Sequence, residues 1–256
     1  MFPLSAWQNL GMSEMATSDF MLVLGAALFG STISGFIGMG GGILLLTVLF
    51  LCGLPPEIAI PVHALVQLVS NGSRLALFKR HVRWGAWRVF ALFALPCPVL
   101  GLMIADDLDP ELTKVLIGVL VIFATWRPKS VSVDWKESRS FACVGLVAGT
   151  LGVVVGATGP LVAPFFLREG WKKEEVIATK AACQVFAHMQ KVVAFGLIGF
   201  SFEAELLFIA PLALAVVLGT WAGKQLLSHM SEQRFRLTYR VVLSALAVRL
   251  MLTPLL

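Results

Sequence analysis

Two stretches of the chain carry strongly polar side chains at helical spacing within otherwise apolar sequence. One stretch contains His63, Gln67, Asn71 and Arg74, and the other contains Lys180, Gln184, His188 and Lys191. Steps of four, four and three residues place each set on one helix face. Polar groups at membrane depth usually face the protein interior or a water-filled cavity, and amide groups donate hydrogen bonds to oxyanions. We therefore interpret the two faces as the lining of a pathway for a small anion.

The eight residues divide by expected role. Those expected to contact the substrate are Gln67, Asn71, Gln184 and His188, and those expected to act in gating or electrostatics are His63, Arg74, Lys180 and Lys191. Other roles stay open: the glutamines also suit hydrogen bonding between helices, and Arg74 and Lys191 also suit anchoring at the membrane surface. The histidines are either neutral packed residues or titrating groups.

Two glycine clusters interrupt the apolar sequence. They run from Gly35 to Gly42 and from Gly149 to Pro160. Glycine is costly inside a helix, and non-helical backbone survives in lipid only where protein buries it or where it lines a cavity. Matching interruptions in two halves of a membrane protein are a sequence pointer to a transport site. We expect each cluster to form the tip of a helical hairpin.

A short helix is expected to start after each tip, near Gly42–Ile43 and at Gly159–Pro160. Helix starts offer unpaired backbone N–H groups and a positive dipole end, which suit an anion. The tip residues expected to bind substrate are Gly40, Gly41, Gly42, Gly156, Thr158, Gly159 and Pro160. The alternative is that these glycines only allow close helix packing.

The composition is that of an integral helical membrane protein. Of 256 residues, 58% are hydrophobic and 14% are charged, whereas soluble domains carry about 25% charged residues. The net charge is +5, but the basic residues sit in short loops, as the positive-inside rule expects, so nucleic acid is not an expected partner. The expected partners are a small anionic substrate and the lipid bilayer, with a homo-oligomer left open.

The apolar segments repeat in two halves. Gly42 matches Gly159, and Gln67 matches Gln184. The predicted division is an interfacial segment at 1–18, a first transmembrane repeat at 19–126, a cytoplasmic linker at 127–139 and a second repeat at 140–256. Basic and acidic loops change sides between the halves, which predicts inverted-topology repeats with both termini outside. Each repeat is expected to hold one glycine-tipped hairpin, either re-entrant or fully spanning, and three spanning helices.

The sequence offers no pattern for enzyme chemistry. It lacks the HExxH and GxSxG motifs, intramembrane carboxylate pairs and an ATP-binding P-loop. The four cysteines, Cys52, Cys97, Cys143 and Cys183, form no CxxC pair, so neither a disulfide framework nor a metal site is expected. We expect a transporter without a cofactor or metal, located in a bacterial inner membrane.

With these features, the chain resembles the TauE/SafE family of sulfite and organosulfonate exporters. The resemblance covers nearly all of residues 19–252 and is strongest from Ser34 to Leu44. It implies export of small sulfur-containing anions such as sulfite, sulfoacetate or other organosulfonates. We expect a secondary transporter working by alternating access. The alternatives are an anion channel of the same fold, or an importer or exporter of another small oxyanion or carboxylate.

Overall fold

The computed structural model describes residues 16–99, 136–155 and 159–252, with a few isolated positions between 115 and 126. These residues form helices and no strand, which confirms the all-helical class. The first half contains α1 (Thr17–Ile37), α2 (Gly41–Leu51), α3 (Pro56–Phe78), the 3-10 turn η3 (Lys79–His81) and α4 (Trp84–Ala94). The second contains α7 (Glu137–Val155), α8 (Gly159–Val162), the 3-10 turn η6 (Ala163–Phe166), α9 (Lys173–Leu197), α10 (Leu206–Ser228) and α11 (Glu232–Leu252).

Two of the described helices, α1 and α10, are both long enough and apolar enough to cross a bilayer. Helix α2 is also apolar but has 11 residues, which rise about 17 Å, or roughly half a hydrocarbon core. Helices α3 and α9 have 23 and 25 residues, and both carry the polar faces described above. The predicted total of six full spans stays a prediction, and the last part of the first repeat, residues 100–126, lies almost entirely outside the described residues.

The first glycine cluster breaks the helix as expected. Helix α1 ends at Gly38, whose φ is 88°, and α2 begins after Gly40, whose φ is 98°. Residues with a Cβ rarely adopt such values, so glycine is required at both positions. The chain therefore reverses between α1 and α2 within three residues, and the short helix starts at Gly41.

The second short helix begins at Gly159, as the sequence predicted. One α-helical turn, α8, is followed directly by the 3-10 turn η6. Pro164 has no N–H group to donate to the carbonyl four residues earlier, so the α-helical pattern cannot continue through it. A helix this short supplies little dipole, so the helix start at the second tip attracts an anion less than the start of α2 does.

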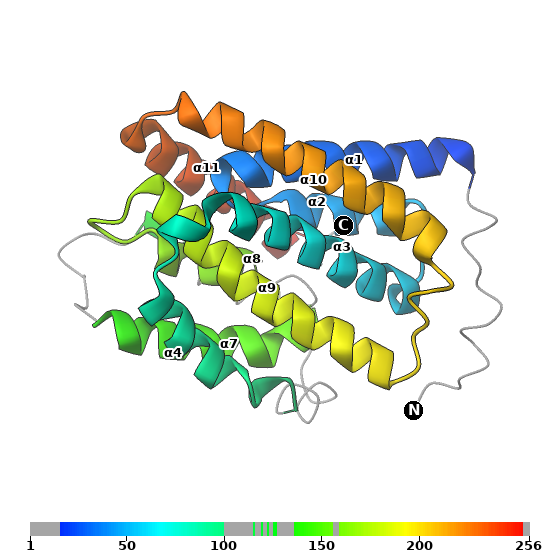
Figure 1. Cartoon of the computed structure of the whole chain (residues 1–256), viewed down its shortest axis with the longest axis horizontal. Coiled ribbons are helices and arrows are strands. Elements are labelled where there is room, and N and C mark those ends of the chain that lie inside the picture. The colour runs from blue at the N-terminus through cyan, green and yellow to red at the C-terminus, as the bar shows by residue number, and fades with distance from the viewer. Residues whose placement is uncertain are drawn as a thin grey trace.

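The helices of the two halves pack against each other in pairs. In Figure 1, α1 lies along α10, α4 lies along α7, and α3 crosses the centre beside α9. Helices α3 and α9 are antiparallel: the chain just after α3 meets the start of α9, where the Arg83 N–H donates to Thr179 Oγ1 at 3.0 Å. Towards their other ends, the rings of His63 and His188 meet edge to face at 5.9 Å.

Small residues permit the closest of these contacts. A Cβ on Gly35 would lie 2.7 Å from the carbonyl oxygen of Thr220, so α1 and α10 touch backbone to backbone. A Cβ on Gly145 would lie 2.5 Å from the carbonyl oxygen of Phe90, so α7 and α4 touch in the same way. Close contact through glycine is a common basis of helix association in membranes.

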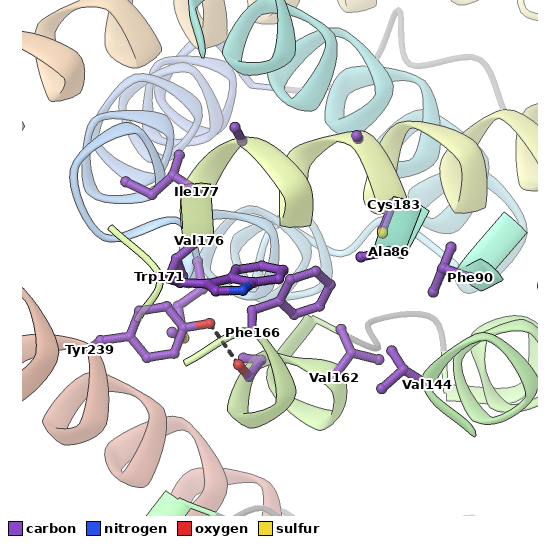
Figure 2. Packing of buried hydrophobic residues seen from close by; sticks show 14 of the residues in the cluster. Ala86, Phe90, Val144, Val162, Phe166, Trp171, Val176, Ile177, Cys183 and Tyr239 are labelled. Carbon is purple, nitrogen blue, oxygen red and sulfur yellow. Dashed lines mark hydrogen bonds between the residues drawn. The ribbon is translucent and has the colours of Figure 1, made fainter. Parts of the chain in front are cut away.

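Two apolar clusters surround these contacts. One joins α1, α2, α3 and α10, and the other joins α4, α7, α9, α11 and the η6 turn. Figure 2 shows the second cluster, in which Tyr239 of α11 donates a hydrogen bond to the carbonyl oxygen of Ala163 at 2.8 Å. The rings of Phe141 and Trp171 stack with centroids 5.8 Å apart. These contacts fix η6 although it has little helical structure of its own.

The loops gather at two ends with different charge. At one end, Arg83 pairs with Glu175 at 2.8 Å, and Arg236 donates to the carbonyl oxygen of Arg168 at 3.0 Å, so three basic loops meet. At the other end lie the loops 52–55 and 198–205, which contain no lysine or arginine. The first is called the basic end below.

Candidate functional site

A polar cavity of about 50 Å³, partly open to solvent, lies between the α1–α2 tip and the two central helices. Its described lining consists of Ser34, Gly38, Met39, Gly40, Gly42, Ile43, His63, Gln67, Asn71, Arg74, Gly159, Lys180, Gln184 and His188. Seven of the eight residues that the helical spacing singled out are in this set. The structure therefore brings the two polar faces together around one space.

The eighth residue, Lys191, is buried but faces elsewhere. It lines a neighbouring, mostly apolar cavity together with Gln190 and Phe195 of α9. Lys191 is therefore not part of the described wall of the polar cavity.

The three glycines of the first tip have three different surroundings. Gly40 supplies the left-handed backbone conformation before α2. Gly41 packs against Gly30 of α1, where any Cβ would collide with the backbone, and it does not line the cavity. Gly42 faces the cavity, where a Cβ would lie 3.2 Å from the Gln67 amide carbon and 3.3 Å from His63 Nε2. Both expected reasons for glycine, close packing and access to a site, therefore apply here at different positions.

Hydrogen bonds tie the first tip to both central helices. His63 Nε2 lies 2.9 Å from the carbonyl oxygen of Gly42, and Lys180 Nζ donates to the carbonyl oxygen of Gly38 at 2.8 Å. The N–H of Gly41 donates to Ser34 Oγ at 2.9 Å. The first-turn N–H groups of Gly42 and Ile43 have no acceptor within the helix, and both residues line the cavity.

Arg74 is held by neutral partners on its own helix. Its Nη1 donates to Asn71 Oδ1 at 3.2 Å, and its Nη2 donates to Ser70 Oγ at 3.0 Å. The side chain is only 3% exposed. The charge of the guanidinium is therefore fixed in place but not neutralised by these contacts.

Buried polar atoms without a partner mark the cavity wall. Three of them belong to cavity residues: Gln184 Nε2, His188 Nδ1 and Arg74 Nε. Buried polar groups in native proteins are nearly always hydrogen-bonded, and each exception calls for an explanation such as a bound ligand. An amide nitrogen and a guanidinium N–H are donors, so the complementary ligand is an acceptor.

The cavity is positively charged. Arg74 and Lys180 are each 3% exposed, and within the described part of the chain neither has a carboxylate within ion-pair distance. No aspartate or glutamate is among the described lining residues. Buried charges are costly unless paired, so this arrangement favours an anionic occupant.

Three of the predicted site residues lie wholly or partly outside the described part of the chain. Gly156 and Thr158 lie outside the described residues, and nothing is described of the Pro160 side chain. The sequence-based prediction did not include four lining residues, Ser34, Gly38, Met39 and Ile43. It also did not include Ser70, which accepts a hydrogen bond from Arg74. Ser70 lies four residues before Arg74 on the same helix face, which was the signal available for it.

The described helices thus surround a polar cavity that has two buried cations in its wall. The family described as "Sulfite exporter TauE/SafE" matches residues 23–250. The chain therefore belongs to the TauE/SafE family, and it is an integral membrane protein.

A curated relative supports the same assignment. The chain is similar to a protein of Cupriavidus necator named "Probable sulfite/organosulfonate exporter TauE", with 26% identity over 162 residues. The similarity covers 60% of this chain and 62% of that relative. No solved structure matches the chain.

Proposed function

We propose that the protein is a secondary transporter that exports sulfite, sulfoacetate or another small organosulfonate across a bacterial inner membrane. The observation that carries the proposal is the pair of buried cations, Arg74 and Lys180, in a cavity without a described carboxylate. Family membership and the name of the Cupriavidus necator relative supply the sulfur-containing class of anion.

The central anion position lies between Gln67 and Gln184 in this proposal. The two amides come from the two central helices, and Gln184 Nε2 has no hydrogen-bond partner among the described residues. One turn further along α9, the ring nitrogen Nδ1 of His188 is a second nitrogen without a described partner. The backbone start of α2 at Gly42 completes the position from the side of the tip.

Alternating access would follow from two inverted halves. Exchanging the halves replaces α1 with α7 and α10 with α4, so the α1–α10 pair becomes the α7–α4 pair, and both pairs are in contact. Gly53 and Gly170, which occupy matching turns, share the same φ of 79°. This pairing supports inverted repeats that rock around the cavity.

The orientation follows from the charge of the two ends. Cytoplasmic loops of membrane proteins carry an excess of lysine and arginine. We therefore place the basic end in the cytoplasm and both termini outside. An anion moving from the basic end outward gains about 2.3 kcal/mol per charge per 100 mV from an interior-negative potential, so uniport suffices for export.

Proteoliposomes test this function. The purified protein is reconstituted, and the flux of labelled sulfite and sulfoacetate is measured at set membrane potentials. We expect saturable, potential-driven flux that falls strongly in Gln67→Ala and Gln184→Leu. Gln190→Leu is the matched control, because Gln190 lies on the same helix and its amide already donates to the carbonyl oxygens of Ala94 and Leu95.

Each contrary result has a definite meaning. Flux that never saturates indicates a channel of the same fold. Flux of other oxyanions or carboxylates but of neither sulfur compound removes the proposed substrate class. Equal flux in Gln184→Leu and wild type removes the central position from the proposal.

A further inference from the structure

Two buried cations lie together at one end of the polar cavity. Arg74 is near the end of α3, Lys180 is near the start of α9, and these helices are antiparallel. Both side chains line the cavity on the side of the basic end.

These cations lie away from the central glutamines. Along α9, Lys180 precedes Gln184 by four residues, a rise of about 6 Å. Along α3, Arg74 follows Gln67 by seven residues, a rise of about 10 Å. A small oxyanion bound between the glutamines would leave room for a separate contact with the cation pair.

Both cations are held in place and keep unused donors. Arg74 uses two of its five N–H groups on Asn71 and Ser70, and its Nε has no partner. Lys180 uses one of three donors on the Gly38 carbonyl oxygen. A guanidinium and an ammonium fixed in this way suit an oxyanion with at least two terminal oxygens.

The opposite end of the cavity has no equivalent pair. Exchanging the halves would put His63 in the place of Lys180 and Lys191 in the place of Arg74. His63, however, contacts the carbonyl oxygen of Gly42 through Nε2, and Lys191 lines the neighbouring apolar cavity. The two ends therefore differ in fixed charge although the halves correspond.

We propose that Arg74 and Lys180 form a second anion-binding position, at the basic end of the cavity and separate from the position between the glutamines. Its ligand is an oxyanion carrying two or more terminal oxygens on one sulfur or similar centre. The inference takes the class of ligand from the proposed function, but it does not require that the protein transports this ligand. Because only one end carries the pair, anions bind more tightly from the basic face than from the other.

Binding stoichiometry tests the proposal without transport. Labelled sulfite is equilibrated with the purified full-length protein in detergent under anoxic conditions, and bound anion is counted per chain. We expect two bound sulfites in wild type at saturation, and one each in Arg74→Gln, Lys180→Met and Gln184→Leu. Arg74→Lys keeps the positive charge but loses the planar guanidinium that donates two parallel hydrogen bonds. We expect this variant to lower the affinity of the second site for sulfite about tenfold or more.

Sided transport gives an independent reading. Inside-out and right-side-out vesicles present the basic face and its opposite. We expect Arg74→Gln to raise the KM for sulfite from the basic face about tenfold or more and to leave the other face unchanged. Monodispersity of each variant by size exclusion excludes misfolding as the cause.

The outcomes separate the two proposals. Two bound sulfites without flux would uphold this position and reject transport of sulfite. Flux with one bound sulfite in wild type, or an equal KM change at both faces in Arg74→Gln, would overturn this position and leave the transport proposal standing. No bound sulfite in wild type would also overturn it.

Discussion

Lys180 of α9 holds the tip of the first hairpin through a 2.8 Å hydrogen bond to the carbonyl oxygen of Gly38. The bond joins residues 142 positions apart, one in each half of the chain. It also places an ammonium group in the cavity wall next to Arg74. One side chain thus both connects the halves and charges the cavity.

These two effects of Lys180 have opposite signs for stability. Losing the hydrogen bond leaves the Gly38 carbonyl oxygen unsatisfied, at a cost of about 1–3 kcal/mol. Removing a buried charge without a carboxylate partner relieves a penalty of several kcal/mol. We therefore expect Lys180→Met, without anion, to unfold at the same temperature as wild type or higher, measured by thermal unfolding in detergent.

Adding anion separates function from stability in the same experiment. Saturating sulfite should raise the unfolding temperature of wild type more than that of Lys180→Met, because ligand binding stabilises the folded state. Lys79→Met, an exposed cation just after α3, is the control and should behave like wild type in both conditions. A large loss of stability in anion-free Lys180→Met would contradict the assignment of an unneutralised charge.

Gly42 and Gly159 form a matched pair for the glycine tips. A Cβ on Gly42 would press on Gln67 and His63, whereas a Cβ on Gly159 would meet nothing within 4 Å. We expect Gly42→Ala to lower flux about tenfold or more by displacing the Gln67 amide, and Gly159→Ala to lower it by less than twofold. Proteoliposome flux compares the two, and a similar loss in both would remove the steric explanation.

Much of the cavity was predictable from spacing alone. His63, Gln67, Asn71 and Arg74 share a face because a helix repeats every 3.6 residues, and the structure confirms that this face lines a cavity. The same argument failed for Lys191, because spacing gives direction only within one helix. The packing of α9 against α3 and α7 turns the last part of α9, including Lys191, towards the neighbouring apolar cavity.

Two other features depended on contacts that a single sequence does not reveal. The second short helix has only one α-helical turn before Pro164, and the η6 turn that follows is fixed by Tyr239, which lies 76 residues after Ala163 in the chain. Gly41 looked like a site residue, but its position follows from packing against Gly30. Local propensity located these segments, and tertiary packing decided their form.

The α1–α10 contact should dominate resistance to unfolding. A Cβ on Gly219 would collide with Ser31 and the backbone of Leu28, so Gly219→Ala forces two helices apart. We expect a loss of about 1–3 kcal/mol of unfolding free energy. Gly25→Ala on α1 has open space around it and should be neutral or stabilising, since alanine favours a helix. Chemical denaturation in mixed micelles measures both, and equal values would show that the contact contributes little.

Orientation can be read from two exposed loop residues. His81 lies at the basic end and Ser201 in the loop at the opposite end. In a background with the four native cysteines replaced, an impermeant thiol reagent on intact cells should label Ser201→Cys and spare His81→Cys. Permeabilised cells should label both, which controls for accessibility. Labelling of His81→Cys in intact cells would reverse the proposed orientation and, with it, the direction assigned to the cation pair.

Energy coupling is the last property that the cavity constrains. No aspartate or glutamate is among its described lining residues, so a carboxylate proton relay is absent from that set. The described titratable side chains of the lining are His63, His188, Arg74 and Lys180, and the two histidine rings meet edge to face. We expect uniport: sulfoacetate flux in proteoliposomes should follow the membrane potential and should not be driven by a pH gradient at zero potential. If a pH gradient alone drives accumulation of sulfoacetate, the His63→Gln, His188→Gln double variant tests whether the two histidines carry the coupled proton. Coupling lost in that variant assigns proton transfer to the histidine pair, whereas coupling that persists excludes the pair and contradicts uniport as well.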